Sequence, residues 1–261
     1  MKKQSFINKA VRLFVLSAAL FTFTLFTTAA QTPSGVKNIV LVHGAFADGS
    51  GWEGVYKILT ARGYNVTVVQ NPLSSLEDDV AAAKLALDKQ DGPAVLVGHS
   101  WGGSVITQAG NSPKVASLVY VAAFQPEVGE TTLDLVMSAP PAPENGILPP
   151  DEKGYVYYDK AKFHKGFAGD LSKEKADFMY ASQGAFGAKG FGTPITEAAW
   201  KTKPTWGVIA TEDKSINPDI LRRIYKRSNT KITEVKGSHV IFISQPKAVA
   251  DVIEAAAKGA K

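Results

Sequence analysis

Apolar and polar residues follow two alternating patterns along the first half of the chain. Short runs rich in Val, Ile and Leu are typical of strands buried in a parallel sheet, and they occupy residues 38–42, 64–69, 94–97 and 115–123. Between them, apolar residues recur at helical spacing over residues 52–62, from Ser75 to the Gly92-Pro93 pair, and over 104–109. This alternation predicts a parallel sheet with right-handed crossover connections.

The pattern changes between residues 124 and 203. This segment has no run typical of a buried strand, its prolines cluster between residues 126 and 150, and it is rich in aromatic residues. An insertion at this point of an α/β sheet lies over the carboxyl ends of the strands, where ligands bind. We therefore expect a cap of short helices and loops, whose aromatic residues mostly hold it on the sheet. A minority are expected to line a substrate pocket, with Phe124 and Trp200 as candidates.

Strand and helix alternate again after this insertion. Strands are expected at residues 205–210 and 231–235, and helices at 217–228, with a solvated basic face, and at 246–258. A chain of 261 residues is long enough for one large α/β domain. We predict a single domain over residues 31–261, with a mostly parallel central sheet flanked by helices and a small cap inserted at about residues 124–203.

The sequence Gly98-His99-Ser100-Trp101-Gly102 joins a predicted buried strand to a predicted helix. The two glycines remove β-carbons that would clash in a sharp strand-to-helix turn, and such a turn pushes the Ser100 hydroxyl out above the sheet. This is the G-x-S-x-G pattern of a nucleophile elbow. A glycine-rich turn with a solvent-exposed serine is the alternative. A dinucleotide-binding loop fits less well, because its G-x-G-x-x-G pattern requires glycine where Ser100 stands.

A serine hydroxyl needs a base that takes its proton, and the base needs a partner that orients it. Of the four histidines, His43 follows the first strand, His99 lies inside the elbow and His164 lies in the cap. His239 follows the last predicted strand, and loops at the carboxyl ends of parallel strands converge on one edge of the sheet. We therefore predict that His239 meets Ser100 and acts as the base.

The orienting acid is expected after the penultimate strand. Asp213 stands three residues beyond Ala210, Glu212 is its neighbour, and Asp219 is a weaker third option. We choose Asp213, because strand alternation lets only one of the two adjacent acids point at His239. The order nucleophile, acid and histidine along the chain matches the α/β-hydrolase arrangement and no other serine-hydrolase order.

Acyl transfer also requires two backbone N–H groups for the oxyanion. One is expected to be the N–H of Trp101, directly after the predicted nucleophile. The other is expected in the loop after the first strand, at Ala45 or Phe46. We expect His43 to brace this loop rather than to transfer protons.

Charge and composition argue against several other functions. The formal net charge is +5, but four of the basic residues lie within residues 1–30, which contain no acid. The rest of the chain is nearly neutral and lacks the electrostatic footprint of a nucleic-acid-binding protein. No Cys/His cluster, P-loop or dinucleotide motif is found, so neither a metal nor a cofactor is expected.

Residues 1–30 resemble a secretory signal peptide. A basic start is followed by a charge-free segment that ends in small residues before Gln31. An uncleaved anchor is the alternative, although the uncharged run is at the lower limit for spanning a bilayer and contains many threonines. The chain has no cysteine, which excludes a disulfide framework, a lipid-modified cysteine and a thiol nucleophile. We expect a periplasmic or secreted protein with no membrane association after cleavage.

These motifs resemble the α/β-hydrolase superfamily over essentially the whole of the predicted mature chain. The matching segments are His43-Gly44-Ala45, Gly98-His99-Ser100-Trp101-Gly102-Gly103, Thr211-Glu212-Asp213-Lys214 and Gly237-Ser238-His239. Within the superfamily, the chain is similar to the compact plant-type group of methyl esterases and hydroxynitrile lyases and to its bacterial relatives. The resemblance implies Ser100, Asp213 and His239 as a triad, with Ala45 and Trp101 as oxyanion donors.

The chain departs from the lyases of that group at two positions. They place a threonine after the first residue of the oxyanion loop and a lysine directly after the catalytic histidine, where this chain has Gly44 and Val240. We therefore predict a serine carboxylesterase that cleaves small or aromatic, apolar esters through an acyl-enzyme on Ser100. An enzyme that cleaves a lactone, amide or C–C bond, or that forms a peracid, is the first alternative. A non-catalytic ligand-binding member of the superfamily is the second.

Overall fold

The computed structural model describes residues 33–260, so the predicted signal peptide lies outside the described residues. Six parallel strands form the central sheet in the order β2-β1-β3-β4-β7-β8. They are β1 (Asn38–Val42), β2 (Asn65–Val68), β3 (Ala94–His99), β4 (Val115–Val121), β7 (Thr205–Ala210) and β8 (Lys231–Val235). The predicted parallel α/β architecture is therefore confirmed.

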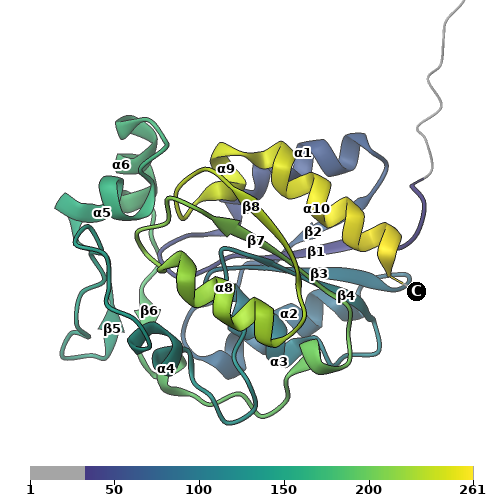
Figure 1. Cartoon of the computed structure of the whole chain (residues 1–261), viewed down its shortest axis with the longest axis horizontal. Coiled ribbons are helices and arrows are strands. Elements are labelled where there is room, and N and C mark those ends of the chain that lie inside the picture. Colours follow the sequence, from purple (N-terminus) through teal and green to yellow (C-terminus); the bar gives the residue numbers. More distant parts are fainter. Residues whose placement is uncertain (1–32, 261) are drawn as a thin grey trace, which may run out of the picture.

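Helices cover both faces of this sheet (Figure 1). They are α1 (Glu53–Ala61) and α10 (Pro246–Gly259) on one face, and α2 (Leu76–Asp88), α3 (Gly102–Ala109) and α8 (Pro218–Arg227) on the other. The side chains of β4 point alternately to the two faces of the sheet: Ser117 bonds to α10, whereas Tyr120 contacts α3 and α8. Strands β1 and β3 are buried at every position, which explains their uninterrupted apolar sequences.

We name the segment between β4 and β7 (residues 124–203) the cap. Its elements are α4 (Thr132–Met137), β5 (Tyr155–Val156), α5 (Lys160–Phe167), α6 (Lys173–Ala181), β6 (Phe186–Gly187), α7 (Lys189–Gly192) and the 3-10 turn η2 (Ala199–Lys201). The helices α4, α5 and α6 and the strands β5 and β6 lie at one end of the sheet, and the last part of the cap runs back to the start of β7 (Figure 1). Beyond the short helices that the sequence predicts, β5 and β6 pair as a small antiparallel sheet. Strands of two residues are too short to produce a visible alternation.

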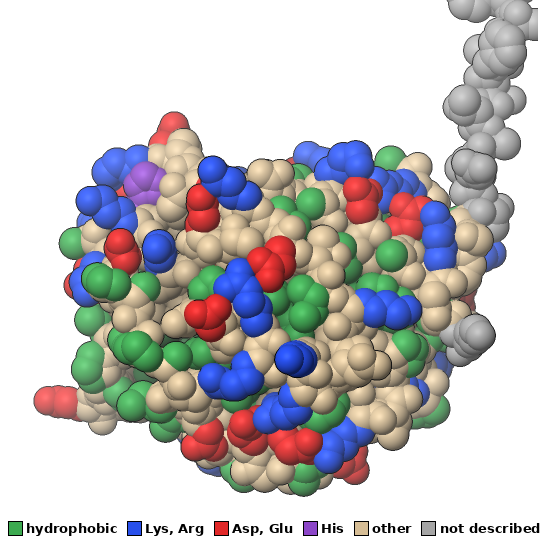
Figure 2. Space-filling view, in the orientation of Figure 1, with side chains coloured by type: hydrophobic (Ala, Val, Ile, Leu, Met, Phe, Trp, Pro, Cys, Tyr) green, Lys and Arg blue, Asp and Glu red, His purple; other side chains and the backbone are tan. Residues whose placement is uncertain are grey.

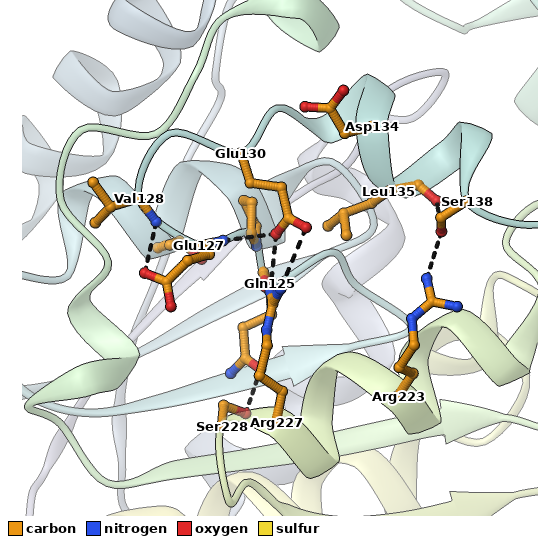
Figure 3. A network of polar contacts seen from close by, with 12 residues as sticks. Gln125, Glu127, Val128, Glu130, Asp134, Leu135, Ser138, Arg223, Arg227 and Ser228 are labelled. Carbon is orange, nitrogen blue, oxygen red and sulfur yellow. Dashed lines mark hydrogen bonds and ion pairs between the residues drawn. The ribbon is translucent and has the colours of Figure 1, made fainter.

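The first part of the cap is fastened to α8 (Figure 3). The guanidinium of Arg227 donates to the carbonyl oxygen of Gln125 at 2.9 Å and to the Glu130 carboxylate at 2.9 Å. Arg223, one turn earlier on α8, donates to the Ser138 hydroxyl at the end of α4. The basic face of α8, predicted from the sequence to be solvated, thus also anchors the cap.

Charges on this side of the molecule are mixed rather than segregated. Figure 2 shows acidic and basic side chains intermingled over the face that carries α8. Arg222, for example, pairs with Asp219 and with Glu234, each at 2.7 Å. Within residues 33–260, every helix is too short or too polar to cross a bilayer.

Candidate active site

Ser100 occupies a strained turn between β3 and α3. Its φ of 52° lies in the left-handed region, which is unfavourable for a residue with a β-carbon. The turn is possible because Gly98 and Gly103 have no side chains. A β-carbon on Gly98 would lie 2.4 Å from the Gly102 carbonyl oxygen, and one on Gly103 would lie 2.1 Å from that of Phe124. The local sequence therefore forms the sharp strand-to-helix elbow that it predicts.

Three loops at the carboxyl ends of β3, β7 and β8 bring Ser100, Asp213 and His239 together. Nε2 of His239 lies 2.8 Å from Oγ of Ser100, and Nδ1 of His239 lies 2.7 Å from Oδ2 of Asp213. All three residues are buried: the exposed fraction is 7% for Ser100, 1% for His239 and 3% for Asp213. With Nδ1 donating its proton to the carboxylate, Nε2 is the bare nitrogen that accepts from the serine hydroxyl.

The second oxygen of Asp213 is held by the backbone. Its Oδ1 accepts from the N–H groups of Ser215 at 2.8 Å and Ile216 at 2.9 Å, so the carboxylate is fixed on both sides. The two alternative acids lie elsewhere. Glu212 is exposed and faces Lys236 at 3.6 Å, and Asp219 pairs with Arg222 on the surface. The geometry thus joins Asp213 alone to His239.

The loop after β1 passes close over Ser100. A β-carbon on Gly44 would lie 2.6 Å from Cβ of Ser100, so only glycine allows this approach. The next residues, Ala45 and Phe46, border the same cavity as Ser100 and His239. Phe46 adopts a φ of 59°. Trp101, whose N–H is the other predicted oxyanion donor, directly precedes α3 and is buried.

The cavity beside Ser100 is small and apolar. Its volume is about 20 Å³, and the cap supplies much of its wall through Val136, Ile147, Phe167 and Phe191. Phe124, a predicted pocket residue, is also part of this wall. No lysine, arginine, aspartate or glutamate borders the cavity within the described chain.

Trp200, the other predicted pocket residue, does not border this cavity, so its prediction as a residue of this pocket is wrong. Its indole Nε1 donates to the carbonyl oxygen of Pro126 at 2.8 Å, and its ring lies under the guanidinium of Arg227 at 5.7 Å. These contacts place Trp200 beside the hydrogen bonds of Arg227 that join α8 to the cap. A tryptophan buried with a partner for its N–H fills a structural position of this kind as readily as a pocket wall.

The other histidines surround the site without touching the Ser100 hydroxyl. His99 is fully buried, and its Nε2 lies 3.0 Å from the backbone oxygen of His239. Burial lowers the pKa of His99 well below its usual value, so its ring is neutral. His43 contacts the Gly44 oxygen at 2.9 Å, and burial lowers its pKa as well. His164 lies in the cap, 2.9 Å from the oxygen of Leu171.

Two carboxylates that the sequence analysis does not single out support these loops. Asp170, between α5 and α6, accepts from the Ser238 N–H at 2.8 Å and from the Ser244 hydroxyl at 2.7 Å. It therefore ties the cap to the loop before His239. Asp79, in the first turn of α2, accepts from the indole of Trp101 at 2.7 Å. Both partners are distant in sequence, so the residue pattern carries no signal for them.

Metal-binding residues are not gathered in this part of the chain. Among residues 33–260, no group of three or more His, Asp or Glu side chains is arranged to hold a metal ion. The donors around Ser100 are a single imidazole, one carboxylate already engaged with it, and backbone groups. The arrangement suits proton transfer to and from a serine hydroxyl.

The chain is similar in sequence and in structure to known hydrolases. The sequence model of the alpha/beta hydrolase family matches residues 39–252. The pyrethroid hydrolase of Sphingobium wenxiniae is 28% identical over 247 residues, which cover 84% of this chain and 86% of that protein. The carbendazim hydrolyzing esterase of Nocardioides sp. is 36% identical over 120 residues, 40% of this chain and 49% of that protein. A crystal structure of a pyrethroid hydrolase from Sphingobium faniae aligns with a TM-score of 0.74 and 25% identity, over 86% of this chain and 98% of that one.

Proposed function

The chain belongs to the alpha/beta hydrolase family, and we propose that within it this hydrolase is a serine esterase with Ser100 as its nucleophile. One observation carries the proposal: Ser100, His239 and Asp213 form a buried chain of hydrogen bonds of 2.8 Å and 2.7 Å. Such a chain activates a serine for acyl transfer. The relative named as an esterase supports the same reaction class.

The proposed reaction has two halves. Oγ of Ser100 attacks the ester carbonyl carbon while Nε2 of His239 takes the hydroxyl proton, and Asp213 stabilises the resulting imidazolium. The N–H of Trp101, together with that of Ala45 or Phe46, receives the oxyanion. The carbon–oxygen bond to the alcohol then breaks, and His239 returns its proton to that alcohol. Water, deprotonated by His239, then attacks the acyl carbon, the bond to Oγ of Ser100 breaks, and His239 returns the proton to Oγ as the acid leaves.

The cavity supports small or aromatic, uncharged esters as substrates. Its wall is made mainly of apolar side chains, and within residues 33–260 no Lys, Arg, Asp or Glu borders it to pair with a charged substrate. A volume of about 20 Å³ accommodates little more than a water molecule. An ester must therefore displace part of the cap as it binds, and the apolar inner side of the cap then covers it.

The first test is hydrolysis of p-nitrophenyl esters of increasing acyl length by wild type and by Ser100→Ala. We expect wild type to cleave the short-chain esters and Ser100→Ala to lose at least about 10³-fold in kcat, as when the nucleophile of a triad is removed. Ser182→Ala, which removes an exposed hydroxyl at the end of α6, should retain full activity.

Two outcomes would contradict the proposal. Turnover that survives Ser100→Ala would mean that the elbow is not the active site. A folded wild-type protein that cleaves none of the esters would exclude the proposed reaction class. Circular dichroism of both variants separates loss of function from loss of fold.

We also propose that residues 1–30 direct export and are removed before Gln31, which gives a periplasmic or secreted protein. The basic start, the charge-free segment and the small residues before Gln31 support this proposal. Intact mass measurement of the protein recovered from the periplasm or medium should give a chain that begins at Gln31. Recovery of the full-length chain in the membrane fraction would favour an anchor.

A further inference from the structure

Asp79 is a buried carboxylate with no part in the reaction described above. It is 0% exposed and lies in the first turn of α2. Its hydrogen-bond partners in the described chain are all neutral donors: the Trp101 indole at 2.7 Å, the Leu73 N–H at 2.7 Å and the Asn71 amide at 3.1 Å. Burial raises its pKa, and these hydrogen bonds counteract that effect. A carboxylate without a cationic partner is costly to bury, so its position calls for a reason.

We propose that Asp79 is a positioning residue of the oxyanion hole, which it orients through the side chain of Trp101. Trp101 is the residue whose backbone N–H is assigned to the oxyanion, and Asp79 fixes the far end of the same residue. The indole is also held by aromatic contacts with Phe186 at 5.1 Å and Phe191 at 5.8 Å. A ring held on three sides leaves its own peptide little freedom to rotate.

The same carboxylate reaches the second oxyanion loop. The Asn71 amide that donates to Asp79 also lies 3.5 Å from the carbonyl oxygen of His43, which directly precedes the loop at residues 44–46. Asp79 is thus connected to both segments of the proposed oxyanion hole, directly to Trp101 and through Asn71 to the loop at residues 44–46.

A third connection leads from Asp79 into the cap. Its Oδ1 accepts the N–H of Leu73, which has a φ of 62°, and the Leu73 oxygen accepts the N–H of Gly187 at 2.8 Å. The neighbouring Phe186 ring lies 5.1 Å from Trp101 and 6.3 Å from Phe46. Asp79 therefore holds the cap strand whose aromatic ring packs against Trp101 and Phe46, a candidate oxyanion residue from each side.

The chemistry of the three donors explains why a carboxylate occupies this position. Oδ2 accepts two hydrogen bonds and Oδ1 accepts one, so both oxygens must be acceptors. Asparagine has nearly the same shape but only one acceptor oxygen, and its NH₂ group would face a donor. Asp79→Asn therefore breaks the arrangement with almost no change in volume.

The test compares Asp79→Asn with Asp78→Asn in p-nitrophenyl acetate hydrolysis. Asp78 is adjacent, exposed, and bonded to Ser74 rather than to Trp101, so it is a matched control. We expect Asp79→Asn to lower kcat by about 10- to 100-fold with KM changed less than about threefold, because a misplaced oxyanion donor acts in the transition state. Affinity for a trifluoromethyl ketone, which forms an oxyanion adduct with serine, should fall in parallel. Asp78→Asn should stay within about twofold of wild type.

A second variant tests the route through the indole. Trp101→Phe keeps an aromatic ring at the position and removes the N–H that Asp79 accepts. It should lower kcat to a similar extent, and the double variant should be no worse than the more affected single variant, because Trp101→Phe removes an interaction that Asp79→Asn already disturbs. This comparison also applies if Asp79→Asn does not fold.

The inference rests on the proposed function, and the outcomes of the two tests are distinguishable. If wild type shows no activity, or if activity survives Ser100→Ala, both the proposed function and the role of Asp79 are excluded. A Ser100-dependent wild-type activity that Asp79→Asn retains at full kcat removes only the role of Asp79. A variant that merely melts at lower temperature, or additive effects of the two substitutions, would assign Asp79 to stability alone.

Discussion

His99, which lies inside the elbow motif, holds His239 in place through its backbone and its ring. Its ring packs between those of His239 and Phe242, at centroid distances of 4.7 Å and 4.4 Å. Its Nε2 donates to the backbone oxygen of His239, which leaves Nδ1 unprotonated and, within residues 33–260, without a hydrogen-bond partner. This neutral ring fixes the peptide of His239, whereas Asp213 fixes its imidazole.

A stability measurement tests the neutrality of His99. Its pKa in the folded protein is lowered, first by burial and then by the nearby His239, whereas in the unfolded chain it is near 6.5. Below about pH 6.5 the unfolded chain therefore binds the additional proton, and the free energy of unfolding falls as the pH falls. One such histidine costs about 1.4 kcal/mol between pH 7.5 and 5.5.

Urea denaturation at both pH values measures this loss. His99→Gln retains a side-chain N–H donor and cannot titrate, so its loss of stability over the same interval should be smaller by about 1.4 kcal/mol. An equal loss in both proteins would mean that His99 takes up a proton in the folded state.

The residues of the proposed triad follow from sequence patterns, whereas the residues that hold them do not. Ser100 is marked by the glycines around it, and His239 and Asp213 by their places after predicted strands. Asp170 and Asp79 act across 68 and 22 positions on partners that no local pattern connects to them. Trp200 is one of many aromatic residues in the cap sequence, and only its contacts with Pro126 and Arg227 in the structure show where it lies.

At the scale of elements, the long periodic segments were predictable and the cap was not. The six strands of the central sheet match the expected runs to within one or two residues. Helix α9 (Ile241–Ser244), directly after His239, is too short to show a period. Three of the cap helices begin with a side-chain cap: Thr131 with Asp134 at α4, Asp159 at α5 and Ser172 at α6. These signals locate helix starts but not the packing of the helices.

The loop between α5 and α6 has a testable role in holding the site. Asp170→Asn removes the negative charge and makes the Ser238 hydroxyl accept from the new NH₂ group instead of donating, which should loosen the loop before His239. We expect kcat/KM for p-nitrophenyl esters to fall about 5- to 10-fold, the effect of about 1 kcal/mol or slightly more.

Limited proteolysis provides a second measurement on the same variant. Cleavage within residues 168–172 should become faster in Asp170→Asn than in wild type. Asp177→Asn, in the exposed pair with Lys173 on α6, should change neither the kinetics nor the cleavage. Unchanged kinetics in Asp170→Asn would mean that the His239 loop holds its place without the cap.

At the scale of the whole molecule, the cap and the central sheet form one unit around the site. The cap touches the Asp213 loop through Tyr158, whose hydroxyl lies 3.2 Å from that of Ser215. It reaches the His239 loop through Asp170, and the loop at residues 44–46 through the rings packed on Phe46. Each loop that carries a proposed functional group is therefore held from the cap as well as from its own strand.

The small volume of the cavity beside Ser100 has a consequence for timing. Since an ester must part the cap from the sheet before it reaches the hydroxyl, every catalytic cycle includes a movement of protein against solvent. That movement takes the same time whichever alcohol the ester carries. For esters that acylate Ser100 faster than the cap moves, turnover depends on solvent viscosity rather than on the reactivity of the leaving group, whereas for slower esters acyl transfer sets the rate.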